Sequence, residues 1–308
     1  MTGLDRLRNA VVTVVEVGPR DGLQNEAAHV ATTDKVTFIN LLSAAGLPVI
    51  EVSAFVSPTW VPNLADAQEV FARIERRSDT RYTALVPNRA GLERAIAVGV
   101  TEVAIFAAAS ETFSRRNINR SIDESLIEYR EVCRCAADAS VRVRAYLSTA
   151  FGCPYEGAVP VAAVLTRTRQ LLDLGVFEVS VSDTIGIAHP GQVSDVLGTL
   201  QGHVDDGQIA LHFHDTRGTA LANVLAGLLA GVRTFDASAG GLGGCPFAPG
   251  AAGNLATNDL IYMLDGLGVV TNVSPDRLDE ATTFIGSRVG HELPSRYAQA
   301  RRARRAAH

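Results

Sequence analysis

The sequence predicts a closed barrel of eight parallel β-strands, each followed by an α-helix. Short segments rich in β-branched residues alternate with stretches of helical periodicity, and eight such pairs fill about 270 residues. A single-domain (β/α)8 barrel commonly takes ~250 residues, so a closed barrel is favoured over a doubly wound sheet. The 47% hydrophobic and 20% charged residues are typical of a globular protein with a large core.

The strands are expected at residues 11–17, 48–54, 81–85, 102–106, 141–148, 177–182, 208–214 and 233–237. Residues that can cap a helix, among them Thr33, Asn88 and Ser121, precede the helical stretches. We expect a barrel domain over residues 1–270 and a short helical extension with a basic tail over 271–308. The four arginines within residues 301–305 either bind a phosphate or acidic partner or, more simply, form a solvated or disordered end.

Charge and composition exclude several classes of protein. A net charge of −5 argues against a nucleic-acid-binding groove, which usually presents a basic face. The four cysteines lack zinc-ribbon spacing and are expected to be reduced thiols. The first ten residues show no signal or transit peptide, and no apolar run approaches the ~18 residues that span a bilayer, so we expect a cytoplasmic protein without membrane contact.

Two histidines predict a metal site at one end of the barrel. Side chains alternate along a strand, so His212 and His214 point to the same side. Core histidines are also common, but this pair ends the seventh strand, where barrel active sites form. Asp21 after the first strand and Asn254 after the eighth can add oxygen ligands, because these strands are neighbours in a closed barrel. Two nitrogens and two oxygens suit Mg²⁺ or Mn²⁺ better than a structural zinc.

Charged residues near the strand ends are further candidates for catalysis. Arg20 precedes the aspartate and can neutralise an enolate or carboxylate oxygen beside the metal; the alternative is a structural ion pair with Glu51 or Asp183. Glu51 and Asp183 are carboxylates in otherwise apolar strands, where a buried charge needs a partner. We expect them to orient Arg20 or to relay a proton. Glu16, at the end of the first strand, is a candidate for the same roles.

A glycine-rich loop predicts a mobile lid. Cys245 lies among six glycines between residues 240 and 253, and a neutral thiol there can protonate a carbanion while the closed loop excludes water. The alternative is that Cys245 only fills an apolar pocket. Cys153 is expected to pack, and Cys133 and Cys135 to be helix residues without chemistry.

Two other features give only weak evidence for ligand binding. The glycines of the lid do not form a dinucleotide-binding fingerprint, because they do not open a βαβ unit. Arg115 and Arg116, expected in the loop after the fourth strand, are candidate contacts for a polyanionic ligand, and a solvated face is an equal alternative.

Specific motifs run through nearly the whole chain. The most specific are VEVGPRDGLQNE at 15–26 and GLGGCP at 241–246, and three shorter ones are FVSP at 55–58, GCPYEG at 152–157 and DTIG at 183–186. With these motifs the chain resembles the 3-hydroxy-3-methylglutaryl-CoA (HMG-CoA) lyase family of the metal-dependent TIM-barrel superfamily. The resemblance implies metal ligation by Asp21, His212, His214 and Asn254, substrate binding and activation by Arg20, and a catalytic Cys245.

The implied reaction is metal-dependent cleavage of HMG-CoA to acetyl-CoA and acetoacetate. His212 or Asp21 would remove the hydroxyl proton, Arg20 would stabilise the enolate and Cys245 would protonate it. The resemblance also implies an acyl-CoA ligand and a homodimer.

Four positions depart from the family pattern: Ala27, Phe213, Ser182 and Arg217. Because Ser182 and Arg217 can reshape the acyl pocket, a lyase for another 3-hydroxyacyl-CoA such as citramalyl-CoA is the first alternative. A barrel that binds metal or acyl-CoA without turnover is the second.

Overall fold

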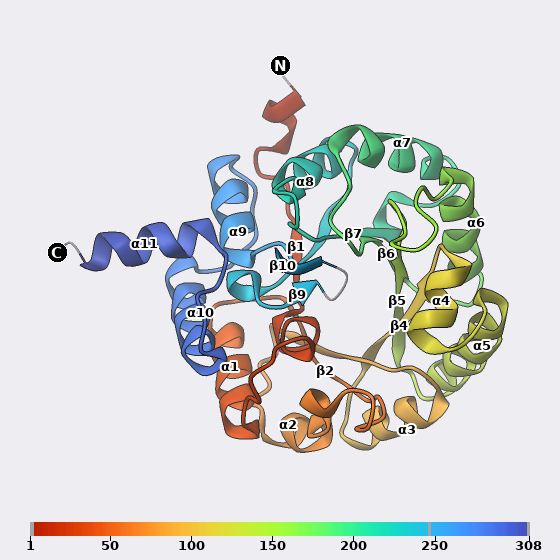
Figure 1. Ribbon diagram of the computed structural model, residues 1–308, viewed down its shortest axis with the longest axis horizontal. Coiled ribbons are helices and arrows are strands. Elements are labelled where there is room, and N and C mark those ends of the chain that lie inside the picture. Colours follow the sequence, from red (N-terminus) through yellow and green to blue (C-terminus); the bar gives the residue numbers. More distant parts are fainter. Residues whose placement is uncertain (1–2, 246–247, 307–308) are drawn as a thin grey trace.

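The computed structural model describes residues 3–245 and 248–306, without the side chains of residues 245, 248–252, 305 and 306. It forms the expected closed (β/α)8 barrel, in which the strands pair in parallel in sequence order and β8 returns to β1 (Figure 1). The strands are β1 (Thr13–Glu16), β2 (Val49–Ala54), β3 (Arg81–Leu85), β4 (Glu102–Ala108), β5 (Arg142–Ser148), β6 (Glu178–Asp183), β7 (Ile209–Phe213) and β8 (Thr234–Ala237). Each predicted strand is confirmed to within two residues at either end.

Helices alternate with the strands and surround the barrel. They are α1 (Thr32–Ala44), α2 (Ala67–Arg73), α3 (Arg89–Ala97), α4 (Glu111–Ile118), α5 (Ile122–Asp138), α6 (Val161–Leu172), α7 (Pro190–Leu200), α8 (Ala220–Leu229) and α9 (Thr257–Gly266). The predicted caps at Asn88 and Ser121 are confirmed, since their side chains accept hydrogen bonds from Gly91 N and Glu124 N. Thr33 was the wrong cap: the extended residue before α1 is Ala31, and Thr33 lies within the helix.

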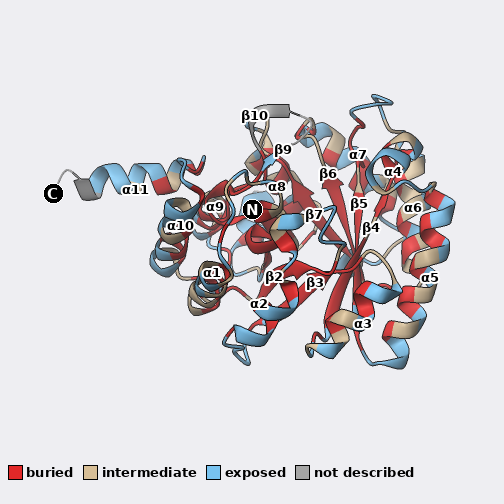
Figure 2. Ribbon diagram, turned by 60° about the horizontal axis from the view of Figure 1, so that its bottom comes forward, coloured by how far each residue is buried: buried red, intermediate tan, exposed pale blue. Residues whose placement is uncertain are grey.

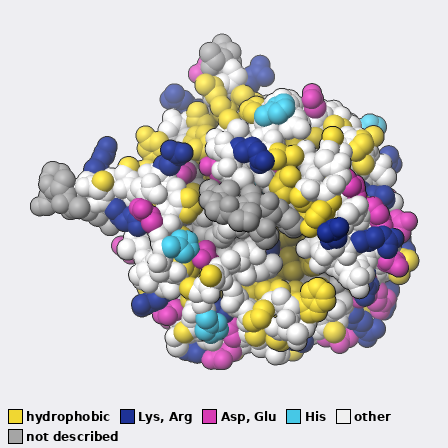
Figure 3. Space-filling model, viewed as in Figure 1, with side chains coloured by type: hydrophobic (Ala, Val, Ile, Leu, Met, Phe, Trp, Pro, Cys, Tyr) yellow, Lys and Arg dark blue, Asp and Glu magenta, His cyan; other side chains and the backbone are white. Residues whose placement is uncertain are grey.

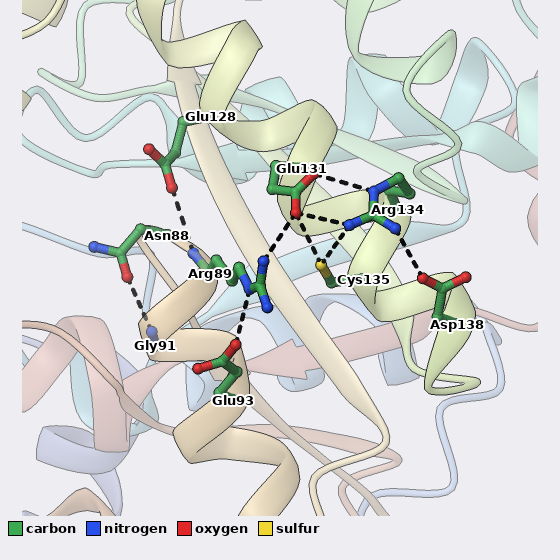
Figure 4. A network of polar contacts seen from close by, with 9 residues as sticks. All are labelled: Asn88, Arg89, Gly91, Glu93, Glu128, Glu131, Arg134, Cys135 and Asp138. Atoms are coloured by element: carbon green, nitrogen blue, oxygen red, sulfur yellow. Dashed lines mark hydrogen bonds and ion pairs between the residues drawn. The ribbon is translucent and has the colours of Figure 1, made fainter.

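The outer face of the barrel carries a polar network between α3 and α5 (Figure 4). Arg89 of α3 pairs with Glu131 of α5, which also accepts a hydrogen bond from Cys135 Sγ at 3.3 Å. Cys133 is buried in the same helix. Both cysteines therefore lie on a helix, as predicted, and away from the ends of the strands.

The barrel wall separates an apolar layer from a polar interior. Val143, Ala145 and Leu147 of β5 belong to the core that the strands share with the helices. Because side chains alternate along a strand, Arg144 and Tyr146 project into the barrel instead. Figure 2 shows the strands buried along their length. Charged groups inside the barrel therefore need partners inside the barrel.

Two helices follow the barrel, α10 (Pro275–Val289) and α11 (Arg296–Ala306). The C-terminal helix α11 projects from the body and is largely exposed (Figures 1 and 2). Arg301 pairs with Asp276 at 2.6 Å and Arg302 with Glu292 at 3.3 Å. The described part of the basic tail is thus helical and mostly exposed, with ion pairs at Arg301 and Arg302. No helix in the described ranges has the length and apolarity that crossing a bilayer requires.

Candidate metal and substrate site

Three of the four predicted metal ligands meet at the carboxyl ends of the strands. Asp21 lies in a helical turn, η2 (Gly18–Gly22), directly after β1, while His212 belongs to β7 and His214 follows it. Their potential ligand atoms all lie within 4.8 Å of one another. Asn254 reaches the same cluster, because its Nδ2 donates to Asp21 Oδ2 at 2.9 Å and its backbone forms a bridge with His214.

Glu16 fixes the turn that carries Asp21. Its Oε1 accepts hydrogen bonds from Gly18 N and Ala239 N, both at 2.8 Å, and its Oε2 accepts one from Thr257. Glu16 therefore ties the loop after β1 to the segment after β8. Burial raises the pKa of Glu16 to about 7, although these three hydrogen bonds lower it. The described contacts of Glu16 are structural.

Arg20 is held rigidly at the edge of the metal cluster. Its Nε donates to Glu51 Oε2 and its Nη1 to Asp21 Oδ1, each at 2.6 Å. The guanidinium carbon lies 5.4 Å from the ring centroid of Tyr146. Burial opposes the charge of Arg20, but Glu51 and Asp21 outweigh it and raise the arginine pKa. Burial also raises the pKa of Asp21, but Arg20 and the two histidines bring it down to about 2. Arg20 and Glu51 are therefore ion-paired, which both sequence interpretations, a structural ion pair and an oriented catalytic arginine, allow.

The donor atoms of the cluster fit a divalent cation. Burial, with His212 nearby, lowers the pKa of His214 to about 4, so its imidazole is neutral at pH 7, as metal binding requires. Among the described residues, His212 Nδ1, His214 Nδ1 and Asn254 Oδ1 are all buried without a hydrogen-bond partner. Buried polar atoms normally have a partner, so orphaned nitrogen and oxygen atoms beside a carboxylate indicate a place for a cation.

A cavity of about 450 Å³ opens from this cluster toward the surface. Arg20, Asp21, His212 and His214 line its inner part. Its outer part is lined by side chains that include Trp60, Asn88, Asn117 and Arg120. Trp60, the single tryptophan of the chain, is 73% exposed. Hydrophobic side chains gather near the centre of the barrel face that Figure 3 presents. The cavity joins a polar inner end to an amphipathic mouth.

A two-stranded hairpin follows β8, formed by β9 (Gly244–Cys245) and β10 (Ala248–Ala252), and it lies near the centre of the barrel in Figure 1. The loop crosses η2 closely: a Cβ on Gly243, whose φ is +100°, would lie 2.9 Å from the Cα of Gly22. Only glycine fits such a crossing. The backbone of Cys245 belongs to the hairpin, but its side chain lies outside the described features, so the thiol has no position here.

Asp183 has contacts other than those proposed from sequence. Its two carboxylate oxygens accept hydrogen bonds from Ile187 N and Ala188 N, at 3.0 and 2.9 Å. It therefore closes the loop after β6, and its described hydrogen bonds do not include Arg20. Ser182 lines the cavity. Arg217 donates to the carbonyls of Ile185 and Gly186 and is not among the residues that line the cavity.

The predicted position of Arg115 and Arg116 was wrong. Both lie in α4 rather than in a loop, because Ser110 caps a helix that begins at once after β4. Arg115 pairs with Glu111 at 3.0 Å, and the Arg116 guanidinium lies 4.6 Å from the ring centroid of Tyr155. Neither lines the cavity. Cys153 is buried against Ala108 and Phe113, in agreement with the packing role expected for it.

Sequence reasoning missed three residues beside the site, namely Arg144, Tyr146 and Asp236. Tyr146 lines the cavity, with its ring centroid 6.2 Å from that of His212. Asp236 Oδ2 lies 3.4 Å from His212 Nδ1 and also accepts a hydrogen bond from Ser180 Oγ at 2.7 Å. The signal was available, because Arg144 and Asp236 are charged residues within predicted strands, as Glu51 is.

Comparisons with known proteins agree with this site. A sequence model of the HMGL-like family matches residues 11–285. A hydroxymethylglutaryl-CoA lyase of Bacillus subtilis is 51% identical over 288 residues, which cover 94% of this chain and 96% of the relative. A solved hydroxymethylglutaryl-CoA lyase of Pseudomonas aeruginosa is 47% identical, with a TM-score of 0.95 over 96% of this chain and 99% of that one.

A third relative was solved with ligands. The structure of an HMG-CoA lyase from Acinetobacter baumannii in complex with coenzyme A and 3-methylmalate is 38% identical, with a TM-score of 0.90 over 97% of this chain and 96% of that one. Likeness of this extent, in sequence and in fold, leaves the family in no doubt. The chain belongs to the HMGL-like family of TIM-barrel proteins and groups within it with the hydroxymethylglutaryl-CoA lyases.

Proposed function

We propose that this protein is a hydroxymethylglutaryl-CoA lyase, a carbon–carbon lyase that cleaves HMG-CoA to acetyl-CoA and acetoacetate. The observation that carries the proposal is the cluster of Asp21, His212 and His214 beside a buried arginine at the inner end of the cavity. Relatives about half identical over nearly the whole chain are hydroxymethylglutaryl-CoA lyases.

Asp21, His212, His214 and Asn254 would hold the cation. Mixed nitrogen and oxygen donors in an open site suit Mg²⁺ or Mn²⁺. When bound, such a cation supplies Lewis-acid polarisation of substrate oxygens. The hydrogen bond from Asn254 to Asp21 keeps the two oxygen donors together, at 2.9 Å between Nδ2 and Oδ2.

Arg20 would stabilise the charge that forms during cleavage. Breaking the bond between the carbinol carbon and the thioester methylene turns the hydroxyl-bearing carbon into the ketone of acetoacetate and leaves the electron pair on the acetyl-CoA enolate. Arg20 lines the cavity, and Glu51 and Asp21 fix its orientation before substrate arrives. A cation fixed in advance stabilises developing negative charge without reorganising.

Two proton transfers complete the reaction. The hydroxyl proton leaves to a base, for which His212 and Asp21 are the candidates within the cluster. The enolate carbon then takes a proton from an acid, for which the Cys245 thiol is our candidate. Cys245 belongs to a hairpin that follows the close crossing of Gly243 over η2, next to the metal cluster.

The cavity supports an acyl-CoA substrate. Its polar inner end would receive the short, charged acyl group, and its mouth would receive the longer and less polar arm. Citramalyl-CoA remains the alternative acyl group, because Ser182 lines the cavity where it can alter the fit. We further propose that the enzyme is a homodimer in the cytoplasm, to be tested by its mass in solution and by fractionation of the source cells.

The test measures product release from purified protein with HMG-CoA and, in parallel, with citramalyl-CoA, each with added Mn²⁺. Acetoacetate release from HMG-CoA that exceeds pyruvate release from citramalyl-CoA supports the proposal. Preference for citramalyl-CoA would replace it with the alternative. Mn²⁺ binding without cleavage of either substrate would leave a barrel that binds without turnover.

A further inference from the structure

A buried carboxylate that the proposed reaction does not use lies directly behind one of the metal ligands. Asp236 of β8 is 1% exposed, and three strands surround its oxygens. Arg144 Nη2 of β5 donates to Oδ1 at 2.7 Å, and Ser180 Oγ of β6 donates to Oδ2 at 2.7 Å. His212 Nδ1 of β7 lies 3.4 Å from the same Oδ2. The Asp236 carboxylate thus contacts side chains from β5, β6 and β7.

The position of Asp236 is fixed from behind. Arg144 Nε donates to Glu178 Oε1 at 2.6 Å, while the guanidinium carbon lies 5.0 Å from the ring centroid of Tyr146. A buried carboxylate without a cation beside it would be costly, and Arg144 supplies that cation. Glu178, Arg144 and Asp236 therefore form a rigid chain of charges that ends at His212.

The two histidines of the cluster differ in their surroundings. Among the described residues neither Nδ1 has a hydrogen-bond partner, but Nδ1 of His212 lies within ion-pair distance of a buried carboxylate. At 3.4 Å the contact of His212 is longer than the 2.7–3.2 Å of an ordinary N–H···O bond. A proton on Nδ1 is nevertheless the arrangement that brings a donor toward the Asp236 oxygen. Nε2 then carries the lone pair.

We propose that Asp236 is a positioning residue for His212. It holds the proton on Nδ1 and thereby directs the lone pair of Nε2 toward the cation, while Arg144 and Ser180 keep its carboxylate in place. Metal-binding histidines commonly donate their second N–H to a carboxylate, and loss of that partner typically costs about 10–100-fold in metal affinity. The inference rests on the metal site of the proposed function, but not on the identity of the acyl-CoA.

The test measures the affinity of the purified protein for Mn²⁺ by calorimetry, without substrate. Asp236→Asn is expected to weaken Mn²⁺ binding by about 10–100-fold. Ser180→Ala, which leaves the charge in place but removes one hydrogen bond to Asp236, is expected to weaken it less. The matched control is Glu102→Gln, since Glu102 is a buried carboxylate of β4 that pairs with Arg81 and Arg142. The control is expected to bind Mn²⁺ as the wild type does.

A second readout separates positioning from folding. Long-range ¹H–¹⁵N spectra of the metal-free wild type should show His212 with its proton on Nδ1, assigned by loss of the signal in His212→Gln. If Asp236→Asn does not fold, this spectrum and Ser180→Ala carry the test. A proton on Nε2, or Mn²⁺ affinity within twofold of wild type in folded Asp236→Asn, would overturn the inference. A wild type that binds Mn²⁺ but does not cleave HMG-CoA would refute the proposed function and leave the inference standing.

Discussion

Two arginines inside this barrel are each paired with one glutamate and one aspartate. Arg20 binds Glu51 and Asp21, and Arg144 binds Glu178 and Asp236, all at 2.6 or 2.7 Å. Both guanidinium groups lie over the ring of Tyr146, at 5.4 and 5.0 Å from its centroid. They differ in what else they face. Arg20 lines the cavity of about 450 Å³, whereas Arg144 lines an interior space of only about 10 Å³.

The difference shows that position along the barrel, rather than side-chain chemistry, separates the two roles. Arg20 follows the end of β1, at the face where loops leave room for a ligand. Arg144 lies near the start of β5, where the barrel is filled by side chains. We therefore assign Arg20 to the reaction and Arg144 to the support of the metal site.

The largest effect is expected where the Arg20 network and the metal cluster share a residue. Asp21→Ala removes a proposed ligand and one partner of Arg20 together. The loss of activity should exceed the ~10–100-fold that is typical of residues one step behind a metal. Acetoacetate release and Mn²⁺ affinity should both fall. Activity within tenfold of wild type would remove Asp21 from the site.

Arg144→Gln should lower the stability of the fold more than it lowers the rate of the reaction. It leaves Glu178 and Asp236 as buried carboxylates without their cation. Breaking a buried ion pair in this way costs about 3–5 kcal/mol. Urea unfolding should show this loss of stability. A variant as stable as wild type would mean that the Arg144 network does not support the barrel.

Arg20→Gln should lower the rate of the reaction more than the stability of the fold. Removing one group that stabilises an oxyanion lowers kcat by about 10²–10³-fold. Mn²⁺ affinity should change little, because the four proposed ligands remain. The kinetic assay and the calorimetry are run on the same preparation. An unchanged kcat with a raised KM would make Arg20 a binding residue only.

Glu16→Gln tests a buried carboxylate whose described partners are uncharged, in contrast to Glu51 and Asp236. The folded pKa of about 7 lies above the usual 4.5, so the folded state keeps a proton that the unfolded chain releases. This contribution to stability is complete below pH 4.5 and is lost as the pH rises to about 7. The glutamine variant should therefore lose less stability than wild type between pH 5 and 7.5, by no more than about 3 kcal/mol. Identical pH profiles in urea unfolding would contradict the assignment.

Much of the site follows from the sequence, because the ends of parallel strands must meet. That geometry was sufficient to predict Asp21, His212, His214 and Asn254 as neighbours, and the structure brings them together. Glu51 was singled out as a carboxylate within an otherwise apolar strand, and the same reasoning applied to Arg144 and Asp236 would have revealed the second network.

Other features of the site could not be predicted from the periodicity of the sequence, because they depend on distances between elements. The partner of each carboxylate depends on the stagger of the strands, which sets Glu51 against Arg20 and leaves Asp183 to bind backbone amides of its own loop. Likewise, α4 begins at Glu111 because Ser110 caps it, and Arg115 and Arg116 therefore lie on a helix and not in the loop that the sequence predicted.

The central claim is that the cluster of Asp21, His212, His214 and Asn254 makes this barrel a metal-dependent lyase. The most direct test measures Mn²⁺ occupancy and acetoacetate release from HMG-CoA in the same titration of metal-free protein. We predict that release rises in proportion to occupancy and stops when a chelator removes the metal. Release that continues after chelation, or full occupancy with no release, would contradict the account.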